Sequence, residues 1–347
     1  MPALMTKTFM IAISILLVGP VFGMGSSNAL VNELNVYSAR NEALIKPLLD
    51  RFSAATGTRI NLVTGKGDAL LTRLLSEGMN SPADLLLTVD AGRLYRAQQA
   101  DVLQPINDSL LAEMIPNHLR SRDDQWIGLS VRARVIVYAH DRVTPNELSS
   151  YEALTEARWK DKICVRSSSN IYNQSLVAGM IASEGIAATD TWLIALVKNF
   201  ARPPAGGDRD QIKAVAAGQC DIAIVNSYYL GGMLRSSDPS QVAAASKVTL
   251  FWPSQNGRGA HINISGVGIT KASKKPALAK ALIAFLANDQ SQQWYGQINN
   301  EFPVRPSVAT SALLQSWGPF KADQLNVSEL GRYNAEAIMA MDRAGWK

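Results

Sequence analysis

Residues 126–141, WIGLSVRARVIVYAHD, form a long and largely apolar run of the kind found in β-strands. A second β-rich passage covers residues 247–270 and contains KVTLFWP and ISGVGIT. The two passages separate two blocks of the chain in which strand-like and helical patterns alternate. This arrangement predicts two lobes that are joined by a two-stranded crossover.

Strands and helices alternate through both blocks. In the first block, LNVYS is followed by a helical pattern at 41–57, with apolar residues at helical spacing: Leu44, Ile45, Leu48, Leu49 and Phe52. In the second block, helical patterns separate strand-like runs at 162–167 and 220–227. Such alternation predicts an α/β fold with mainly parallel sheets and helices on both faces. Two lobes of this kind imply a ligand cleft, with binding groups at the carboxyl ends of strands.

The expected boundaries follow from these patterns. Residues 1–29 begin with a short charged segment, continue with an apolar run and end in small residues, which is typical of a cleavable secretory signal. The apolar run is shorter than the roughly 20 residues of a spanning helix, so we expect an exported protein that is not embedded in a membrane. We assign the rest to an N-lobe, 30–131 with about 250–275, and a C-lobe, 132–249 with about 276–347.

Composition and motifs exclude several classes of function. The 347-residue chain has a formal net charge of +5, which hints at an anionic ligand, but no Lys/Arg run that would indicate nucleic-acid binding. It contains no G-x-S-x-G elbow, no H-E-x-x-H motif and no complete phosphate-binding loop, so we expect no enzyme. Its three histidines, His118, His140 and His261, are scattered and do not indicate a zinc or haem site.

Two cysteines lie at the starts of strand-like runs, Cys164 in DKICVR and Cys220 in GQCDIAIV. In an oxidising compartment they are candidates for one disulfide between neighbouring strands. Two buried free thiols are the alternative. In either case we expect the cysteines to support the fold and not to take part in the chemistry of a site.

Tyrosines gather where predicted strands end. Tyr37 closes the first strand, Tyr172 follows ICV within a few residues, and Tyr228 and Tyr229 follow IAIV. A phenol has a pKa of about 10, but its oxygen becomes a strong anionic donor when a metal ion displaces the proton. Ferric iron is small, trivalent and oxygen-seeking, and tyrosinate ligation of iron is known from haem proteins. Three phenolates would balance its charge.

The adjacent pair in NSYYLGG, residues 226–232, would point to opposite faces of a strand. If Ser227 instead caps a helix that begins at Tyr228, the two side chains differ by about 100° around the axis and can both enter the cleft. Residue types alone leave two alternatives open. The tyrosines could pack at the cleft rim, or they could form an aromatic cage for an organic cation.

A family resemblance narrows these alternatives. The segments NIYNQSLVA and DIAIVNSYYLGG, together with VYSARNEALIKPLLDRFSAATG, SVRARVIVY and the terminal MDRAGWK, closely resemble the periplasmic ferric-ion-binding proteins of bacterial iron ABC transporters. The resemblance covers nearly the whole chain after residue 29. It implies the two-lobed periplasmic-binding-protein fold of type II, in which a two-strand hinge lets the lobes close over the ligand.

The resemblance also implies particular roles. Tyr172, Tyr228 and Tyr229 match the family's ferric ligands in the second lobe. Arg132 matches a position that holds a synergistic anion such as carbonate or bicarbonate, and Arg40 is a further candidate for that anion. A guanidinium suits this task because its planar fork pairs with two oxygens at once. A plain arginine at the lobe boundary is the alternative for Arg132.

One position departs from the family pattern. Many relatives have His-Tyr or His-Glu after a turn like YSAR, whereas Asn41 and Glu42 stand here. Asn41 is a poor ferric ligand, so the first lobe is expected to contribute Glu42, or only an anion and water. Glu42 also fits a solvated acid in the first turn of its helix. Tyr37 and Tyr138 lie in matching segments and are weaker candidates, which fit packing roles better than ligation.

The predicted function is therefore capture of Fe³⁺ in the periplasm and its delivery to an ABC transporter permease in the inner membrane, by a protein expected to be a monomer. The alternative is a binding protein of the same fold for an oxyanion or an organic cation. Iron bound by tyrosinate is coloured, whereas those complexes are colourless.

Overall fold

The structure is a computed structural model that describes residues 1–2 and 32–347, and residues 32–347 form one unit. All but the first two residues of the predicted secretory signal, 1–29, therefore lie outside the described residues. Within the described part of the chain, no helix is both long enough and apolar enough to cross a membrane.

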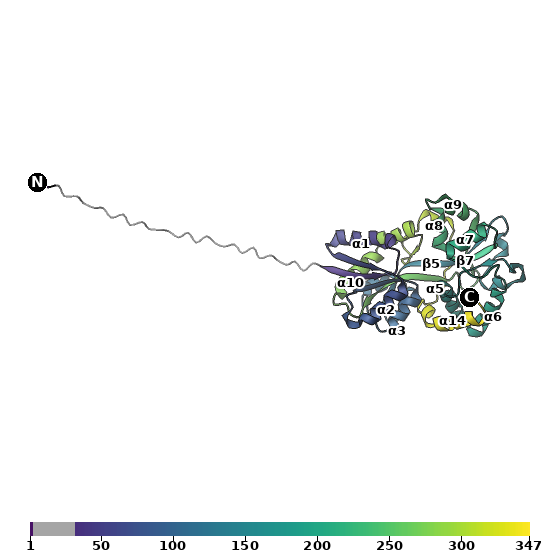
Figure 1. Ribbon diagram of the computed structural model, residues 1–347, viewed down its shortest axis with the longest axis horizontal. Coiled ribbons are helices and arrows are strands. Elements are labelled where there is room, and N and C mark those ends of the chain that lie inside the picture. Colours follow the sequence, from purple (N-terminus) through teal and green to yellow (C-terminus); the bar gives the residue numbers. More distant parts are fainter. Residues whose placement is uncertain (3–31) are drawn as a thin grey trace. The chain divides into compact units, whose positions relative to one another are not determined.

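Two long strands, β5 (Trp126–Ala139) and β9 (Ile262–Thr270), cross the centre of this unit and pair antiparallel. The first half of β5 pairs with β9, and from Arg134 onward β5 pairs with β7 (Ile222–Asn226) and β8 (Val248–Phe251) instead. One strand therefore contributes to both halves of the sheet. Figure 1 shows β5 between a group of helices that includes α1, α2, α3 and α10 and a second group that includes α6, α7, α9 and α14. The predicted crossover at 126–139 and the α/β class are confirmed.

The sheet is mixed, with the strand order β2-β1-β3-β9-β5-β7-β6. Its parallel pairs are β1 with β2, β1 with β3, and β6 with β7. The second predicted passage, 247–270, is not continuous, because residues 252–261 separate β8 from β9. This connection contains Pro253, which lacks a backbone donor, and Gly259 with φ of 101°, and neither residue suits the interior of a strand.

The first strand-helix unit forms as its sequence predicts. Strand β1 (Glu33–Ser38) leads into α1 (Glu42–Thr56), where the Asn41 side chain accepts a hydrogen bond from the Ala43 amide and caps the helix. Gly57 ends α1 in the left-handed conformation, with φ of 71°. Four of the five apolar residues noted in the sequence are buried: Ile45, Leu48, Leu49 and Phe52. The carboxyl end of β1 and the start of α1 thus meet at one edge of the sheet.

A separate hydrophobic cluster forms where α5 (Ile171–Glu184) and α6 (Ile186–Val197) pack beside β7 and the C-terminal helix α14 (Asn334–Arg343). A disulfide joins Cys164 to Cys220, with their Cα atoms 5.9 Å apart. Cys164 ends β6 (Ile163–Cys164), the strand that pairs with β7. The predicted disulfide between neighbouring strands is confirmed.

The helical pattern at 276–296 forms three pieces rather than one helix. Helix α10 (Pro276–Ala287) ends at Asn288, whose side chain caps α11 (Asp289–Trp294), and a π-helical turn η6 (Tyr295–Asn299) follows. Helix α10 contacts α1 and α4, which belong to the predicted N-lobe. The lobe boundaries remain a prediction, and these contacts lead us to propose that residues 276–287 belong with the N-lobe instead of the C-lobe.

The remaining elements complete the two layers of helices and the edges of the sheet. The helices are α2 (Gly67–Glu77), α3 (Ala91–Gln99), α4 (Ser109–Met114), α7 (Asp208–Ala216), α8 (Ser227–Leu234), α9 (Pro239–Ala245), α12 (Ala312–Ser316) and α13 (Ser328–Arg332). The remaining strands are β2 (Arg59–Thr64), β3 (Leu85–Val89), β4 (Leu103–Gln104) and β10 (Phe302–Pro303). Short 3₁₀ turns lie at η1 (Gly78–Asn80), η2 (Asn117–Leu119), η3 (Pro145–Glu147), η4 (Glu152–Thr155) and η5 (Ala157–Trp159).

Candidate metal-binding site

Tyr228 and Tyr229 stand in the first turn of α8, directly after the carboxyl end of β7. The helix begins at Ser227 with Asn226 at the N-cap, one residue earlier than predicted, and continues through both glycines to Leu234. The two rings lie 4.3 Å apart between centroids and are tilted by 35°. A helix rather than a strand at this point is what lets two adjacent phenols share one side of the backbone.

Gly231 explains why α8 can continue. A Cβ built on Gly231 would lie 2.9 Å from Cβ of Asn300, closer than real side chains approach. The segment that follows η6 therefore packs directly against the backbone of α8. This contact brings Asn300 and its neighbour Glu301 to the helix that carries the tyrosine pair.

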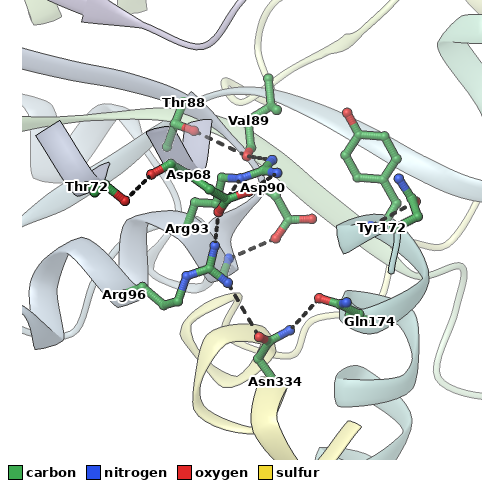
Figure 2. Close-up of polar contacts among 12 residues, drawn as sticks. Asp68, Thr72, Thr88, Val89, Asp90, Arg93, Arg96, Tyr172, Gln174 and Asn334 are labelled. Carbon is green, nitrogen blue, oxygen red and sulfur yellow. Dashed lines mark hydrogen bonds and ion pairs between the residues drawn. The ribbon is translucent and has the colours of Figure 1, made fainter. Parts of the chain in front are cut away.

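Tyr172 stands in the first turn of α5, where the side chain of Asn170 accepts a hydrogen bond from the Tyr172 amide and caps the helix. Figure 2 shows Tyr172 at the start of this helix. Like the Tyr228–Tyr229 pair, Tyr172 is thus placed by the N-terminus of a helix.

The three tyrosines line one cavity of about 350 Å³, together with Arg132, Arg40 and Asn41. A larger cavity of about 520 Å³ lies around Arg258, but no tyrosine lines it. The structure thus brings together the three phenols and both arginines that the sequence singled out. The polar lining of this cavity includes three phenols, guanidinium groups, the carboxyl group of Glu301 and the side chains of asparagines.

Arg132 is buried beside the tyrosine rings. Its Nη2 donates to the Ile264 carbonyl at 2.8 Å and to Ser265 Oγ at 2.6 Å, which anchors the side chain on β9. Its guanidinium carbon lies 5.5 Å from the ring centroid of Tyr172 and 5.7 Å from that of Tyr228. Burial lowers the pKa of Arg132, but the surrounding phenols and carboxyls outweigh it, and the net direction is upward. A permanent cation therefore faces the cavity.

Arg40 is held by an acid that the sequence analysis missed. Its Nη2 lies 3.0 Å from Oε2 of Glu301, which also accepts a hydrogen bond from Ser130 Oγ. Burial raises the pKa of Glu301, but the nearby Arg40 and Arg132 lower it further than burial raises it. Glu301 lines the cavity as an ionised carboxylate. No local pattern marks it, since it is a single acid in the segment NNEFPVRP, 261 residues from Arg40.

Arg209 is a second cavity residue that the sequence did not indicate. Its guanidinium carbon lies 5.4 Å from the ring centroid of Tyr229, and it lines the same cavity. It lies in α7, where its position gave no signal apart from its charge.

The tyrosine pair is protonated when no cation is present. Burial raises the pKa of Tyr228 well above 10, and the phenols of Tyr172 and Tyr229 raise it further. Burial also raises the pKa of Tyr229, with Tyr172 and Asp208 adding to the effect. A metal ion that binds these oxygens must therefore displace their protons.

Three weaker candidates do not line this cavity. Glu42 is exposed at the start of α1, and Asn41 beside it reaches the cavity instead. Tyr37 donates its hydroxyl to Glu77 at 2.9 Å. Tyr138 packs in the hydrophobic cluster around α5 and α6. Among the described residues, no group of three or more His, Cys, Asp or Glu side chains could hold a metal ion, so the candidate site depends on phenols.

Asp90 ties the end of β3 to the helix that carries Tyr172. It is buried at the end of β3 with φ of 81°, an unusual conformation for a residue other than glycine. Its carboxylate accepts hydrogen bonds from Ser175 Oγ in α5 at 2.8 Å and from Asn263 Nδ2 in β9 at 2.9 Å. The first turn of α5 is thereby held against the crossover strand.

A chain of polar contacts also connects α2 and α3 with α14 and α5 (Figure 2). Asp68 of α2 pairs with Arg93 and Arg96 of α3. Arg96 donates to Asn334 at 3.5 Å, and Asn334 donates to Gln174 at 3.3 Å. This chain links α2 and α3 to α5, one turn or less from Tyr172.

Comparisons with known proteins agree with this architecture. The family of bacterial extracellular solute-binding proteins matches residues 48–322. Iron uptake protein A1 of Synechocystis is 44% identical over 91% of this chain and 88% of its own length. A Trichodesmium protein solved with iron and citrate has a TM-score of 0.89 at 50% identity, over 91% of this chain and all of its own.

A third similar structure is ferric iron-binding protein A of Mannheimia haemolytica, which was solved in an open conformation. It has a TM-score of 0.84 at 41% identity, over 91% of this chain and 99% of its own.

Proposed function

The chain belongs to the bacterial extracellular solute-binding proteins, in the group of iron uptake and ferric-ion-binding proteins, and on this basis we propose that it binds Fe³⁺ through Tyr172, Tyr228 and Tyr229. Members of this family are solute-binding transport proteins and not enzymes, in agreement with the sequence prediction. The fold is the two-lobed fold of this family, with a cleft between the lobes.

The convergence of three phenols on one cavity carries this proposal. Three phenolate oxygens would neutralise the three charges of Fe³⁺, and the N-termini of α5 and α8 would favour the anionic form of each tyrosine. Ferric iron would therefore be bound as a neutral tris-phenolate unit, while softer cations that prefer nitrogen or sulfur would find no ligands of their kind in this cavity.

We further propose that a small synergistic anion, such as carbonate, occupies the remaining coordination positions. Arg132 supports this role because it is a buried cation beside the rings of Tyr172 and Tyr228, with its Nε free of partners among the described residues. The Trichodesmium relative contains iron with citrate, so other carboxylates are to be tested as the anion beside carbonate. Arg40 forms an ion pair with Glu301, so it would attract the anion only at longer range.

In the proposed cycle, Fe³⁺ first meets the tyrosines on the second lobe, and closure about β5 and β9 then excludes water from the cleft. A relative solved in an open conformation supports such a motion. The closed protein would carry iron through the periplasm to the permease of an ABC transporter. Protonation of a phenolate, reduction of the ion or loss of the anion would each weaken binding and release it.

The test is a titration of the purified protein with ferric citrate in the presence of bicarbonate, followed by visible absorption. We expect a broad phenolate-to-iron band that saturates at one equivalent and is absent in the double variant Tyr228→Phe, Tyr229→Phe. Tyr37→Phe is the matched control, because its hydroxyl bonds to Glu77 outside the cavity. A folded wild-type protein without such a band would refute iron as the cargo.

The three arginines around the cavity favour one second candidate, an oxyanion as the transported solute. Arg40, Arg132 and Arg209 would then bind the ligand directly, and the phenols would donate hydrogen bonds. Calorimetry with phosphate, sulfate and citrate in the absence of iron separates the two, since tight binding of an anion alone without colour would support this candidate.

A further inference from the structure

The three cavity tyrosines come from two helices, and neither helix alone sets the spacing between them. Tyr172 belongs to α5, and the Tyr228–Tyr229 pair belongs to α8. Metal binding requires that the oxygens meet at one point, so some group must fix the two helix starts relative to each other.

Arg134 lies at this junction. It is a buried residue of β5, at the point where the strand leaves β9 and pairs with β7, and its register partner is Asn226. Its Nη2 donates to Asn173 Oδ1 at 2.5 Å, and its Nη1 donates to Asn226 Oδ1 at 3.2 Å. Asn173 follows Tyr172 in the chain, and Asn226 is the N-cap of α8. One guanidinium therefore bonds to both helix starts.

Asp208 holds this guanidinium in place. Its Oδ1 accepts from Arg134 Nη1 at 2.6 Å and from the Asn226 amide at 3.0 Å, and its Oδ2 accepts from Arg166 Nη1 at 2.6 Å. Arg166 in turn has its guanidinium carbon 5.8 Å from the ring centroid of Tyr172. Asp208 is buried, so these bonds satisfy the charge of a carboxylate that has no access to water.

A buried ion pair of this kind is poor evidence for net stability, because removing two charges from water costs about as much as their attraction returns. The guanidinium of Arg134 instead fixes the positions of its partners. Its planar fork can hold two acceptors in fixed directions, whereas a lysine presents one compact charge. The value of Arg134 therefore lies in the position it imposes on Asn173 and Asn226.

We propose that Arg134, fixed by Asp208, is the positioning residue that sets the spacing between Tyr172 and the Tyr228–Tyr229 pair. The inference deepens the proposed function and rests on it. Arg134 does not bind the proposed ion or the phenol oxygens itself. It acts through the side-chain oxygens of Asn173 and Asn226.

The first test is Arg134→Lys, which keeps a positive charge beside Asp208 but cannot bond to both asparagines in one plane. We expect a folded protein whose ferric affinity, measured by competition with a chelator, falls by between about 10-fold and 100-fold, the usual effect of residues that orient metal ligands. We also expect the visible band per bound iron to shift and weaken, because fewer phenolates reach the ion. Arg142→Lys is the matched control, since Arg142 pairs with Asp221 and neither residue lines the tyrosine cavity.

The outcomes separate this inference from the proposed function. A wild-type protein without the iron band refutes the proposed function itself. A wild-type band that Arg134→Lys retains unchanged, with unchanged affinity, refutes the positioning role while iron binding stands. A lower unfolding temperature with an unchanged band per iron shows a merely structural role and likewise overturns the proposal.

A second variant decides the matter if Arg134→Lys does not fold. Asn173→Ala removes the bond that ties Arg134 to the helix of Tyr172, together with the bonds that Asn173 Nδ2 donates to the Arg166 and Ser167 carbonyls, and leaves the pair with Asp208 intact. We expect its iron band to resemble that of Tyr172→Phe. A band equal to that of the wild type would contradict the role assigned to Arg134.

Discussion

Iron binding should release protons from the tyrosine pair, and the structure sets a lower limit on the pH dependence. Burial and neighbouring phenols raise the pKa of both Tyr228 and Tyr229 above 10, so both are protonated at neutral pH. Deprotonating a phenol of pKa about 10 at pH 7.4 costs about 3.5 kcal/mol, since each unit is about 1.4 kcal/mol. Deprotonation of both tyrosines therefore makes the binding free energy of the ion less favourable by at least about 7 kcal/mol.

The measurable consequence is a steep rise of affinity with pH. Each displaced proton changes the affinity about tenfold per pH unit, so the two residues together should weaken ferric binding at least about 100-fold between pH 7.5 and 6.5. Tyr229→Phe releases one proton fewer when iron binds. The change of its ferric affinity over this interval should therefore be about tenfold smaller than that of the wild type. Affinities are measured by competition with a chelator whose own pH dependence is known.

Two observations would refute this reasoning. The first is a wild-type affinity that changes less than about tenfold over this interval while the visible band persists, because buried neutral phenols cannot become ligands without releasing protons. The second is an equal change in Tyr37→Phe and Tyr229→Phe, since Tyr37 bonds to Glu77 and does not line the cavity.

Three further predictions concern stability and packing. Burial lowers the pKa of His261 to about 3, so the stability that the neutral imidazole contributes is complete above about pH 6.5 and is lost as the pH falls. Between pH 7.5 and 5.0, urea unfolding should show that His261→Gln loses about 2 kcal/mol less stability than the wild type. Replacing both Cys164 and Cys220 by Ser should lower the unfolding free energy, measured in the same way, by about 4 kcal/mol, because the disulfide closes a loop of 56 residues. Gly231→Ala should weaken ferric binding in chelator competition, because its Cβ meets Asn300 at 2.9 Å, whereas Gly257→Ala, outside this cavity and with its nearest neighbour, the Ser254 carbonyl, at 3.7 Å, should not.

Much of the fold was predictable because its causes are local. The helical spacing of Ile45, Leu48, Leu49 and Phe52 decides which face of α1 is buried, and Gly57 decides where the helix ends. The apolar run at 126–139 is long enough for one strand to cross the unit. The prediction of one helix at 276–296 was wrong for a local reason as well. The side chain of Asn288 caps α11 and so divides the amphipathic pattern into α10 and α11.

The candidate site was predictable only in part. The tyrosines could be found because they follow strand-like runs, and the resemblance to a family added roles for them. Glu301 could not be found, because its importance comes from Arg40 and Ser130, which approach it from distant parts of the chain. Tyr37 and Tyr138 also lie in segments that match the family, but they stand within strands, and their side chains bond to Glu77 and pack in a hydrophobic cluster instead.

The sequence by itself determined the class of the fold, the crossover strand, two candidate cysteines for a disulfide and the positions of three phenols shortly after predicted strands. These features depend on periodicity, chain composition and capping, which act over a few residues. Only the tertiary structure decided which phenols share a cavity, which acid holds Arg40, and that Arg134 and Asp208 lie beneath both tyrosine helices. These pairings join residues far apart in the chain, and their geometry is set by how the buried surfaces of the lobes pack together.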